Sequence, residues 1–172
     1  SFTPTSGKTG QVVNITGTNL TGATAVSFGG TAARSFAVVS ATSINATVGA
    51  GASGSVSVTT AAGTGTRAGF TYLPPPTITS FSPTSAGTGQ TVTITGTNFT
   101  GVTAVRFGNT AASSFTVVSA TSITAVVGAG ATGNVRIVTA NGNTNRAGFT
   151  FISATPAPAI TSFTPTSGKT GQ

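Results

Sequence analysis

The sequence contains no Asp, Glu, His, Cys, Met or Trp. General acid–base catalysis near neutral pH needs a side chain that titrates there, usually a histidine or a carboxylate with a shifted pKa. Metal ions are held in proteins mainly by carboxylates, imidazoles and thiolates, and a serine or threonine without a nearby base is a poor nucleophile. We therefore expect a protein that is not an enzyme, with no catalytic residue, no metal site and no cofactor.

Long apolar segments are missing as well. Without cysteine there is no disulfide framework, so the packing of a hydrophobic core must stabilise the fold. No apolar run reaches the ~18 residues of a transmembrane helix, and we expect no membrane span within this sequence.

The strong positive charge comes from missing acids rather than from abundant bases. The net charge is +7, yet only 4% of the residues are charged. The arginines stand singly, without the basic run that follows a phosphate backbone. We expect solvated side chains and no nucleic-acid partner. The five arginines are Arg34, Arg67, Arg106, Arg136 and Arg146.

The chain repeats itself. Residues 1–72 align with residues 80–151 without a gap and are identical at 49 of 72 positions, and residues 162–172 repeat residues 1–11 letter for letter. A period of this size indicates one small folded unit per repeat. The predicted organisation is a first repeat in 1–73, a proline-rich linker in 74–77, a second repeat in 78–152, a second proline-rich linker in 153–159 and the first strand of a third repeat in 160–172.

In several short segments, every second residue is identical in the two repeats, and the residues between them differ. In VVNIT and its copy TVTIT, Val13 and Ile15 are kept as Val92 and Ile94 while their neighbours change. A period of two is typical of β-strands, and the kept positions are predicted to point inward. Further strands of the first repeat are predicted in 25–28 (AVSF), 43–48 (SINATV), 55–60 (SVSVTT) and 68–73 (AGFTYL).

About seven strands per repeat, separated by glycine-rich turns, predict an all-β sandwich of two sheets. Asn141-Gly142 predicts a two-residue hairpin turn between the last two strands of the second repeat. Phenylalanines kept in both copies are predicted core residues rather than stacking platforms for sugars or bases. They are Phe2, Phe28, Phe36 and Phe70, with Phe81, Phe107, Phe115 and Phe149 in the second repeat.

Five motifs occur in the same order in both repeats. They are ITSFxPTS, xVTITGTNF, AVxFGxTAA, VVSATSITA and a closing GFTF or GFTY. In these motifs the chain resembles the IPT/TIG family of immunoglobulin-like domains. The resemblance implies tandem immunoglobulin-like (IPT/TIG) β-sandwiches. It also implies a bacterial cell-surface or extracellular fibre protein, with an extracellular, cell-surface or secreted location.

Two functions of different kinds follow. The preferred one is a structural repeat region of an extracellular bacterial stalk, adhesin or filament. There the chain acts as a stiff spacer, because proline-rich linkers favour extended polyproline II geometry. Its partners are then neighbouring repeats or copies of itself in a fibre. The alternative is a binding module whose outward strands hold a matrix or polysaccharide such as a cell-surface glycan.

Arg106 and Arg136 are candidate partner contacts. They replace Ser27 and Ser57 at outward positions of two strands that are expected to lie side by side. Like charges without an acid between them indicate a site for an anion, an acceptor-rich surface or an adjoining subunit. Two solvated arginines are the competing interpretation.

Ser162, Phe163 and Pro165 are candidates for strand exchange. They belong to a copy of the opening strand whose own repeat does not follow within this sequence. Such a strand can compete for the place of the identical first strand in another molecule. A continuous covalent array explains the same repetition, and both interpretations remain open on the sequence alone.

Overall fold

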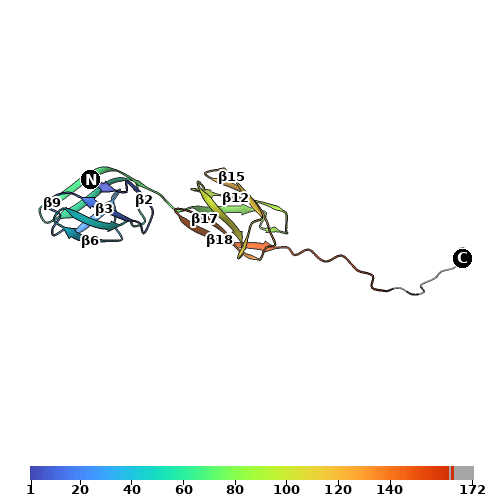
Figure 1. Ribbon diagram of the computed structural model, residues 1–172. Helices are drawn as coiled ribbons and strands as arrows, with labels where there is room; N and C mark the ends of the chain where they lie inside the picture. The colour runs from blue at the N-terminus through green and yellow to red at the C-terminus, as the bar shows by residue number, and fades with distance from the viewer. Residues whose placement is uncertain (163, 165–172) are drawn as a thin grey trace.

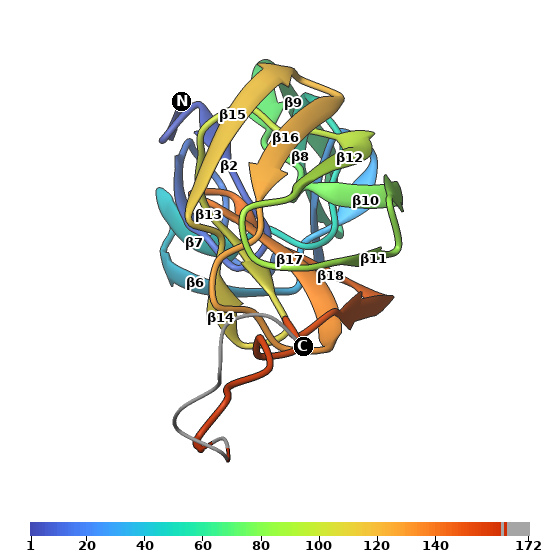
Figure 2. The same ribbon diagram turned by 90° about the vertical axis from the view of Figure 1, so that its right-hand side faces the viewer.

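The computed structural model describes residues 1–162 and 164. Its two repeats are separate β-sandwiches that follow one another along the molecule. The segment after the second repeat leads away on the side opposite the first repeat (Figure 1). In Figure 2, a quarter turn from that view, the two repeats overlap in projection. Within the described residues nothing helical has the length and apolarity needed to cross a bilayer. The all-β prediction is confirmed.

Nine strands form the first repeat, more than the seven or so that the sequence predicts. They are β1 (Phe2–Thr3), β2 (Ser6–Gly7), β3 (Val12–Thr16), β4 (Ala25–Phe28), β5 (Thr31–Ala32), β6 (Ser35–Ser40), β7 (Ser43–Thr47), β8 (Gly54–Thr60) and β9 (Gly63–Tyr72). One sheet has the order β1-β3-β7-β6 and the other the order β2-β9-β8-β4-β5. Strands β2 and β9 pair in parallel. The additional strands are only two residues long, which is too short for a sequence to show alternating inward and outward positions.

The second repeat has the same topology. Its strands are β10 (Thr77–Ser82), β11 (Ser85–Ala86), β12 (Thr91–Thr97), β13 (Val102–Phe107), β14 (Thr110–Ala111), β15 (Ser114–Ser119), β16 (Ser122–Val126), β17 (Gly133–Thr139) and β18 (Gly142–Phe151). The sheets have the orders β10-β12-β16-β15 and β11-β18-β17-β13-β14. Thr77, which the sequence places in the linker, is the first residue of β10. Strand β10 is six residues long, whereas β1 has only two.

The inward positions are predicted correctly. Val13 and Ile15 are buried in β3, as Val92 and Ile94 are in β12. Each repeat has a hydrophobic core cluster of its own. Of the predicted core phenylalanines, Phe36 and Phe115 are only partly buried at the edge of these clusters. The others are buried in the two cores: Phe2, Phe28, Phe70, Phe81, Phe107 and Phe149.

The hairpin turn before β18 lies one residue earlier than predicted. Thr139 and Gly142 close the ladder, so the turn residues are Ala140 and Asn141. The Oγ1 of Thr139 accepts a hydrogen bond from the backbone N–H of Asn141 at 3.2 Å and donates one to the carbonyl oxygen of Gly142 at 3.1 Å. A threonine hydroxyl therefore sets the turn, and the Asn-Gly pair does not.

The corresponding turn of the first repeat also depends on a threonine hydroxyl. Its turn between β8 and β9 has Ala61 and Ala62 at the same positions, with no Asn-Gly pair. The Oγ1 of Thr60 nevertheless accepts from the N–H of Ala62 at 3.2 Å and donates to the carbonyl oxygen of Gly63 at 3.3 Å. The threonine and the following glycine are the shared features of both turns.

Candidate functional site

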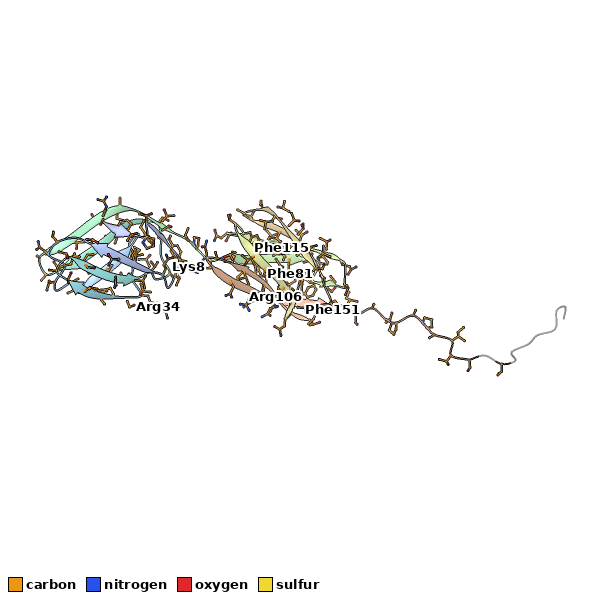
Figure 3. The ribbon with its side chains drawn as sticks, in the orientation of Figure 1. Lys8, Arg34, Phe81, Arg106, Phe115 and Phe151 are labelled. Carbon is orange, nitrogen blue, oxygen red and sulfur yellow. The ribbon has the colours of Figure 1, made fainter. Side chains whose placement is uncertain are left out.

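The two arginines singled out by the sequence lie directly opposite each other. Arg106 in β13 and Arg136 in β17 are Cα partners in the antiparallel register, and both side chains are exposed. Ser27 and Ser57 form the corresponding pair in the first repeat. The structure therefore brings the two predicted contact residues together on one face of the second repeat, where Figure 3 labels Arg106.

A third polar residue extends the pair across the sheet. Asn145 in β18 lies opposite Arg136, and we call Arg106, Arg136 and Asn145 the donor row. The Nη1 of Arg106 donates to the carbonyl oxygen of Asn109 at 3.2 Å. The sequence offers no carboxylate side chain to either guanidinium. Like charges directly opposite each other weaken a strand pair, and guanidinium groups suit carboxylate- or phosphate-like acceptors. A partner role for these arginines remains a prediction.

The candidates for strand exchange follow the second repeat. Ser162 is exposed and lies in a stretch without regular strand pairing. Phe163 and Pro165 lie outside the described residues. No contact of Ser162 with either sandwich is described, and strand exchange also remains a prediction.

A lysine connects the two repeats. Lys8, in the loop after β2, donates from Nζ to the carbonyl oxygen of Ala140 in the turn before β18, at 2.7 Å. The two residues are 132 positions apart in the chain. Figure 3 shows Lys8 at the boundary between the two sandwiches. This hydrogen bond joins a loop of the first sandwich to a turn of the second.

Hydrogen bonds hold the chain at the residue before the proline-rich linker and at Pro75 within it. The backbone N–H of Leu73 donates to the carbonyl oxygen of Gly7 in the first repeat, at 2.9 Å. The Nδ2 of Asn98 in the second repeat donates to the carbonyl oxygen of Pro75 at 3.1 Å. We call these contacts, together with the Lys8–Ala140 hydrogen bond, the repeat joint.

The repeat joint was not found from the sequence. Lys8 stands in SGKTG, and the second repeat has Gly87 at the corresponding position. From the sequence alone, this difference indicates that a repeat can fold without the lysine. It does not indicate that the lysine side chain contacts another domain. The informative signal is that lysine returns as Lys169 in the third opening segment, so that it alternates along the chain as the linker length does.

A family model describes nearly the whole chain. The IPT/TIG domain model matches residues 1–73 and residues 76–153. The chain belongs to the IPT/TIG family. Both IPT/TIG domains are immunoglobulin-like sandwiches, as the resemblance implies. A search of curated protein sequences found no match to the chain.

Solved structures with similar domains include a protein from a xyloglucan utilization locus, a surface glycan-binding protein and the extracellular region of a plexin. SGBP-B from a complex xyloglucan utilization locus in Bacteroides uniformis is 26% identical, with a TM-score of 0.43 over 83% of this chain and 45% of that one. The surface glycan-binding protein PbSGBP-B from Prevotella bryantii is 20% identical, with a TM-score of 0.40 over 82% and 36%. The plexin A4 extracellular region is 20% identical, with a TM-score of 0.41 over 87% and 17%. The IPT/TIG chain spans less than half the length of each of these proteins.

The surface of the two IPT/TIG domains offers no aromatic platform among the residues that the structure describes. The exposed large hydrophobic side chains in this part of the chain are aliphatic. Tyr72 packs against the first core, and its hydroxyl shares a hydrogen bond of 2.7 Å with Oγ1 of Thr9. Phe36 and Phe115 are only partly exposed. The described surface therefore presents aliphatic and polar side chains, the donor row among them.

Proposed function

We propose that this IPT/TIG chain is a non-catalytic structural region of an extracellular bacterial stalk, adhesin or filament, in which it holds neighbouring parts at a fixed spacing. The observation that supports this proposal is the repeat joint. Lys8, Leu73 and Asn98 each make a hydrogen bond across or onto the linker region. Domains joined by an unattached linker move independently by default, whereas here Lys8 bridges the two sandwiches and Asn98 holds the linker carbonyl of Pro75.

The linker sequence supports the same function. Pro74, Pro75 and Pro76 fix their own φ angles and favour an extended chain. A Cβ added at Gly142 would lie 3.0 Å from the Cβ of Pro75, so the linker also packs closely against the second repeat. A short, proline-rich segment held in this way transmits the orientation of one domain to the next.

The spacing can be measured directly because the chain has no native thiol. Ala37→Cys in β6 and Thr116→Cys in β15 place one spin label at equivalent exposed positions of each repeat. We expect a narrow distance distribution by pulsed electron spin resonance. A distribution as broad as that of two domains on a flexible tether contradicts the spacer function. Antibodies against the chain should also label intact cells of the source organism if the protein is extracellular.

Binding of an anionic polysaccharide or matrix is the second candidate function, and the donor row is the observation that favours it. The matched control is present in the chain, because the first repeat has serines where the second has arginines. We expect the wild-type chain to be retarded in a gel containing alginate, an anionic polysaccharide, and the variant with Arg106→Ser and Arg136→Ser to migrate freely. Arg34→Ser, a charge change on the first repeat, should have a smaller effect. Equal retardation of all three proteins would argue against a site at the donor row.

A further inference from the structure

The turn between β17 and β18 carries the one Asn-Gly pair of the sequence, at Asn141 and Gly142. The first repeat has Ala62 and Gly63 at the same positions and forms an equivalent turn. Since the Thr139 hydroxyl sets the turn, the hairpin can form without an asparagine. The side chain of Asn141 is therefore available for a role that the fold does not require.

The side-chain amide of Asn141 makes no hydrogen bond to the part of the chain that the structure describes. The backbone N–H of the same residue is engaged, because it donates to the Oγ1 of Thr139 at 3.2 Å. Asn141 and Gly142 are both half-buried, and Ala140 before them is exposed. No hydrogen bond of the side chain thus has to break before this amide can react.

An asparagine followed by a glycine has a chemical route to an acidic residue. The backbone nitrogen of Gly142 attacks the side-chain carbonyl carbon of Asn141, and a C–N bond forms. The amide nitrogen leaves as ammonia and carries the proton of the Gly142 N–H with it. Water then opens the cyclic imide at either carbonyl carbon and gives aspartate or isoaspartate. Glycine favours the first step because it has no Cβ to hinder the approach to its nitrogen.

The position of the pair in the hairpin favours this reaction. The ladder closes at Thr139 and Gly142, so Gly142 must leave this pairing before its nitrogen can reach the Asn141 side chain. Pairs at the end of a ladder open locally at a lower free energy than pairs in its middle. Asn143 and Asn145 lie further inside the ladder and precede threonine and arginine. Reaction is therefore expected at Asn141 first.

A carboxylate on residue 141 would meet a positive charge of the first repeat. The Nζ of Lys8 donates to the carbonyl oxygen of Ala140 at 2.7 Å, and residue 141 follows Ala140 directly. An ammonium group has three N–H donors, of which one serves Ala140. The sequence has no Asp or Glu that could occupy the others. Opposite charges this close attract each other, most strongly at low salt.

We propose that Asn141 is a deamidation site and that the carboxylate formed there pairs with Lys8 across the repeat joint. The conversion replaces a neutral amide by the only acidic side chain of the sequence. Both products carry this carboxylate on residue 141. An ion pair is thereby added to the Lys8–Ala140 hydrogen bond, and the joint becomes firmer as the protein ages. This last consequence rests on the proposed spacer function, whereas the conversion and the ion pair do not.

The conversion is tested on the full chain, which is kept in warm, mildly alkaline buffer and then digested with trypsin. Cleavage after Arg136 and Arg146 releases residues 137–146 as one peptide with three asparagines. We expect fragment masses to place the new acid at residue 141 and isoaspartyl methyltransferase to label the isoaspartate fraction. Conversion at Asn141 should be at least several-fold faster than at Asn143 and Asn145. The variant Asn141→Gln should stay unconverted, since its longer side chain would have to close a larger ring.

The ion pair is tested with Asn141→Asp, which reproduces one of the two products. Its carboxyl group is the only one on a side chain of this protein, so carbon NMR can follow its titration without overlap from other residues. Pairing with an ammonium group lowers the pKa of a carboxyl group. We expect this pKa to be lower in Asn141→Asp than in Asn141→Asp combined with Lys8→Ala. Arg34→Ala is the matched control, because it removes a charge from the same repeat and should leave the pKa almost unchanged.

The effect on the joint is measured with the spin labels at positions 37 and 116. Asn141→Asp should give a narrower distance distribution than the wild type at low salt. High salt should reduce this difference, because screening weakens an exposed ion pair. Lys8→Ala in the same chain should remove it.

Two results overturn the proposal. One is an Asn141 that converts no faster than Asn143 and Asn145, and the other is a carboxyl pKa that Lys8→Ala does not change. Narrow label distances in the wild type together with either result would leave the spacer function standing. Broad distances in a chain that shows both the conversion and the lowered pKa would disprove the spacer function alone.

Discussion

The ammonium group of Lys8 donates a hydrogen bond to the carbonyl oxygen of Ala140, across the boundary between the two repeats. A charged donor and a backbone acceptor form one of the stronger hydrogen bonds available at a protein surface. The second repeat has Gly87 in place of the lysine, and the linker that follows it is longer. The joint that follows the second repeat therefore has no lysine at the corresponding position.

The first prediction concerns this hydrogen bond. Lys8→Ala should broaden the distance distribution between labels at positions 37 and 116, because one of the contacts that fix the joint is lost. Arg34→Ala is the control, since it removes a positive charge from the same repeat and no inter-repeat hydrogen bond of Arg34 is described. Thermal stability should change little in both variants, as both side chains are at the surface. Identical distributions for the wild type and Lys8→Ala would show that the linker alone fixes the joint.

The second prediction concerns the core of the second repeat. Ile94 is 0% exposed and belongs to its central cluster, so Ile94→Ala should destabilise this repeat by about 2–5 kcal/mol through lost burial and a residual cavity. Thr93→Ala changes the outward neighbour on the same strand and should cost well under ~1 kcal/mol. Urea unfolding followed by a probe in the second repeat measures both values. Equal losses would contradict the inward assignment of Ile94.

A third prediction compares equivalent glycines. Gly96→Ala should lower the stability of the second repeat by more than ~1 kcal/mol, because the new methyl group would collide with the Thr77 backbone. Gly17→Ala should change the stability of the first repeat far less, since its nearest neighbour is a movable leucine side chain. Hydrogen exchange resolved by repeat can follow the two effects in one molecule. A larger loss at Gly17 would contradict the contacts that the structure gives the two glycines.

The fourth prediction concerns pH. Without Asp, Glu or His, the folded and unfolded chains should bind almost equal numbers of protons between about pH 4 and 8. Stability should then have almost no slope in this range. Scanning calorimetry at constant ionic strength should give a Tm that moves by no more than a few degrees. A larger shift would require a titrating group that the sequence does not contain.

The sequence predicts most of the long strands and their buried positions. It predicts few of the hydrogen bonds that form turns or join the two repeats. Alternation in VVNIT identifies β3 and its buried Val13 and Ile15, because side chains on a strand point alternately to opposite faces. The hairpin turn was misplaced by one residue because the Thr139 hydroxyl, a weaker sequence signal than Asn-Gly, determines the closing pair.

Features that depend on distant segments could not be predicted. The Lys8–Ala140 hydrogen bond joins two loops of different domains, and no spacing rule connects them. The surroundings of Gly96 are another example, although Gly17 and Gly96 have the same neighbours in sequence. Only the register of β10 against β12 shows that Gly96 lies opposite Ile78 and close to the Thr77 carbonyl.

The parallel pairing of β2 with β9 determines how each repeat responds to a pulling force. The chain enters this pair at the start of β2 and leaves it at the end of β9, and in a parallel pair these points lie at opposite ends of the ladder. Tension applied to the two ends of a repeat therefore slides the two strands past each other and loads their hydrogen bonds together, including the 2.9 Å bonds from Thr71 to Thr5 and from Leu73 to Gly7. The same arrangement recurs between β11 and β18. We expect single-molecule stretching to give one sharp rupture per repeat.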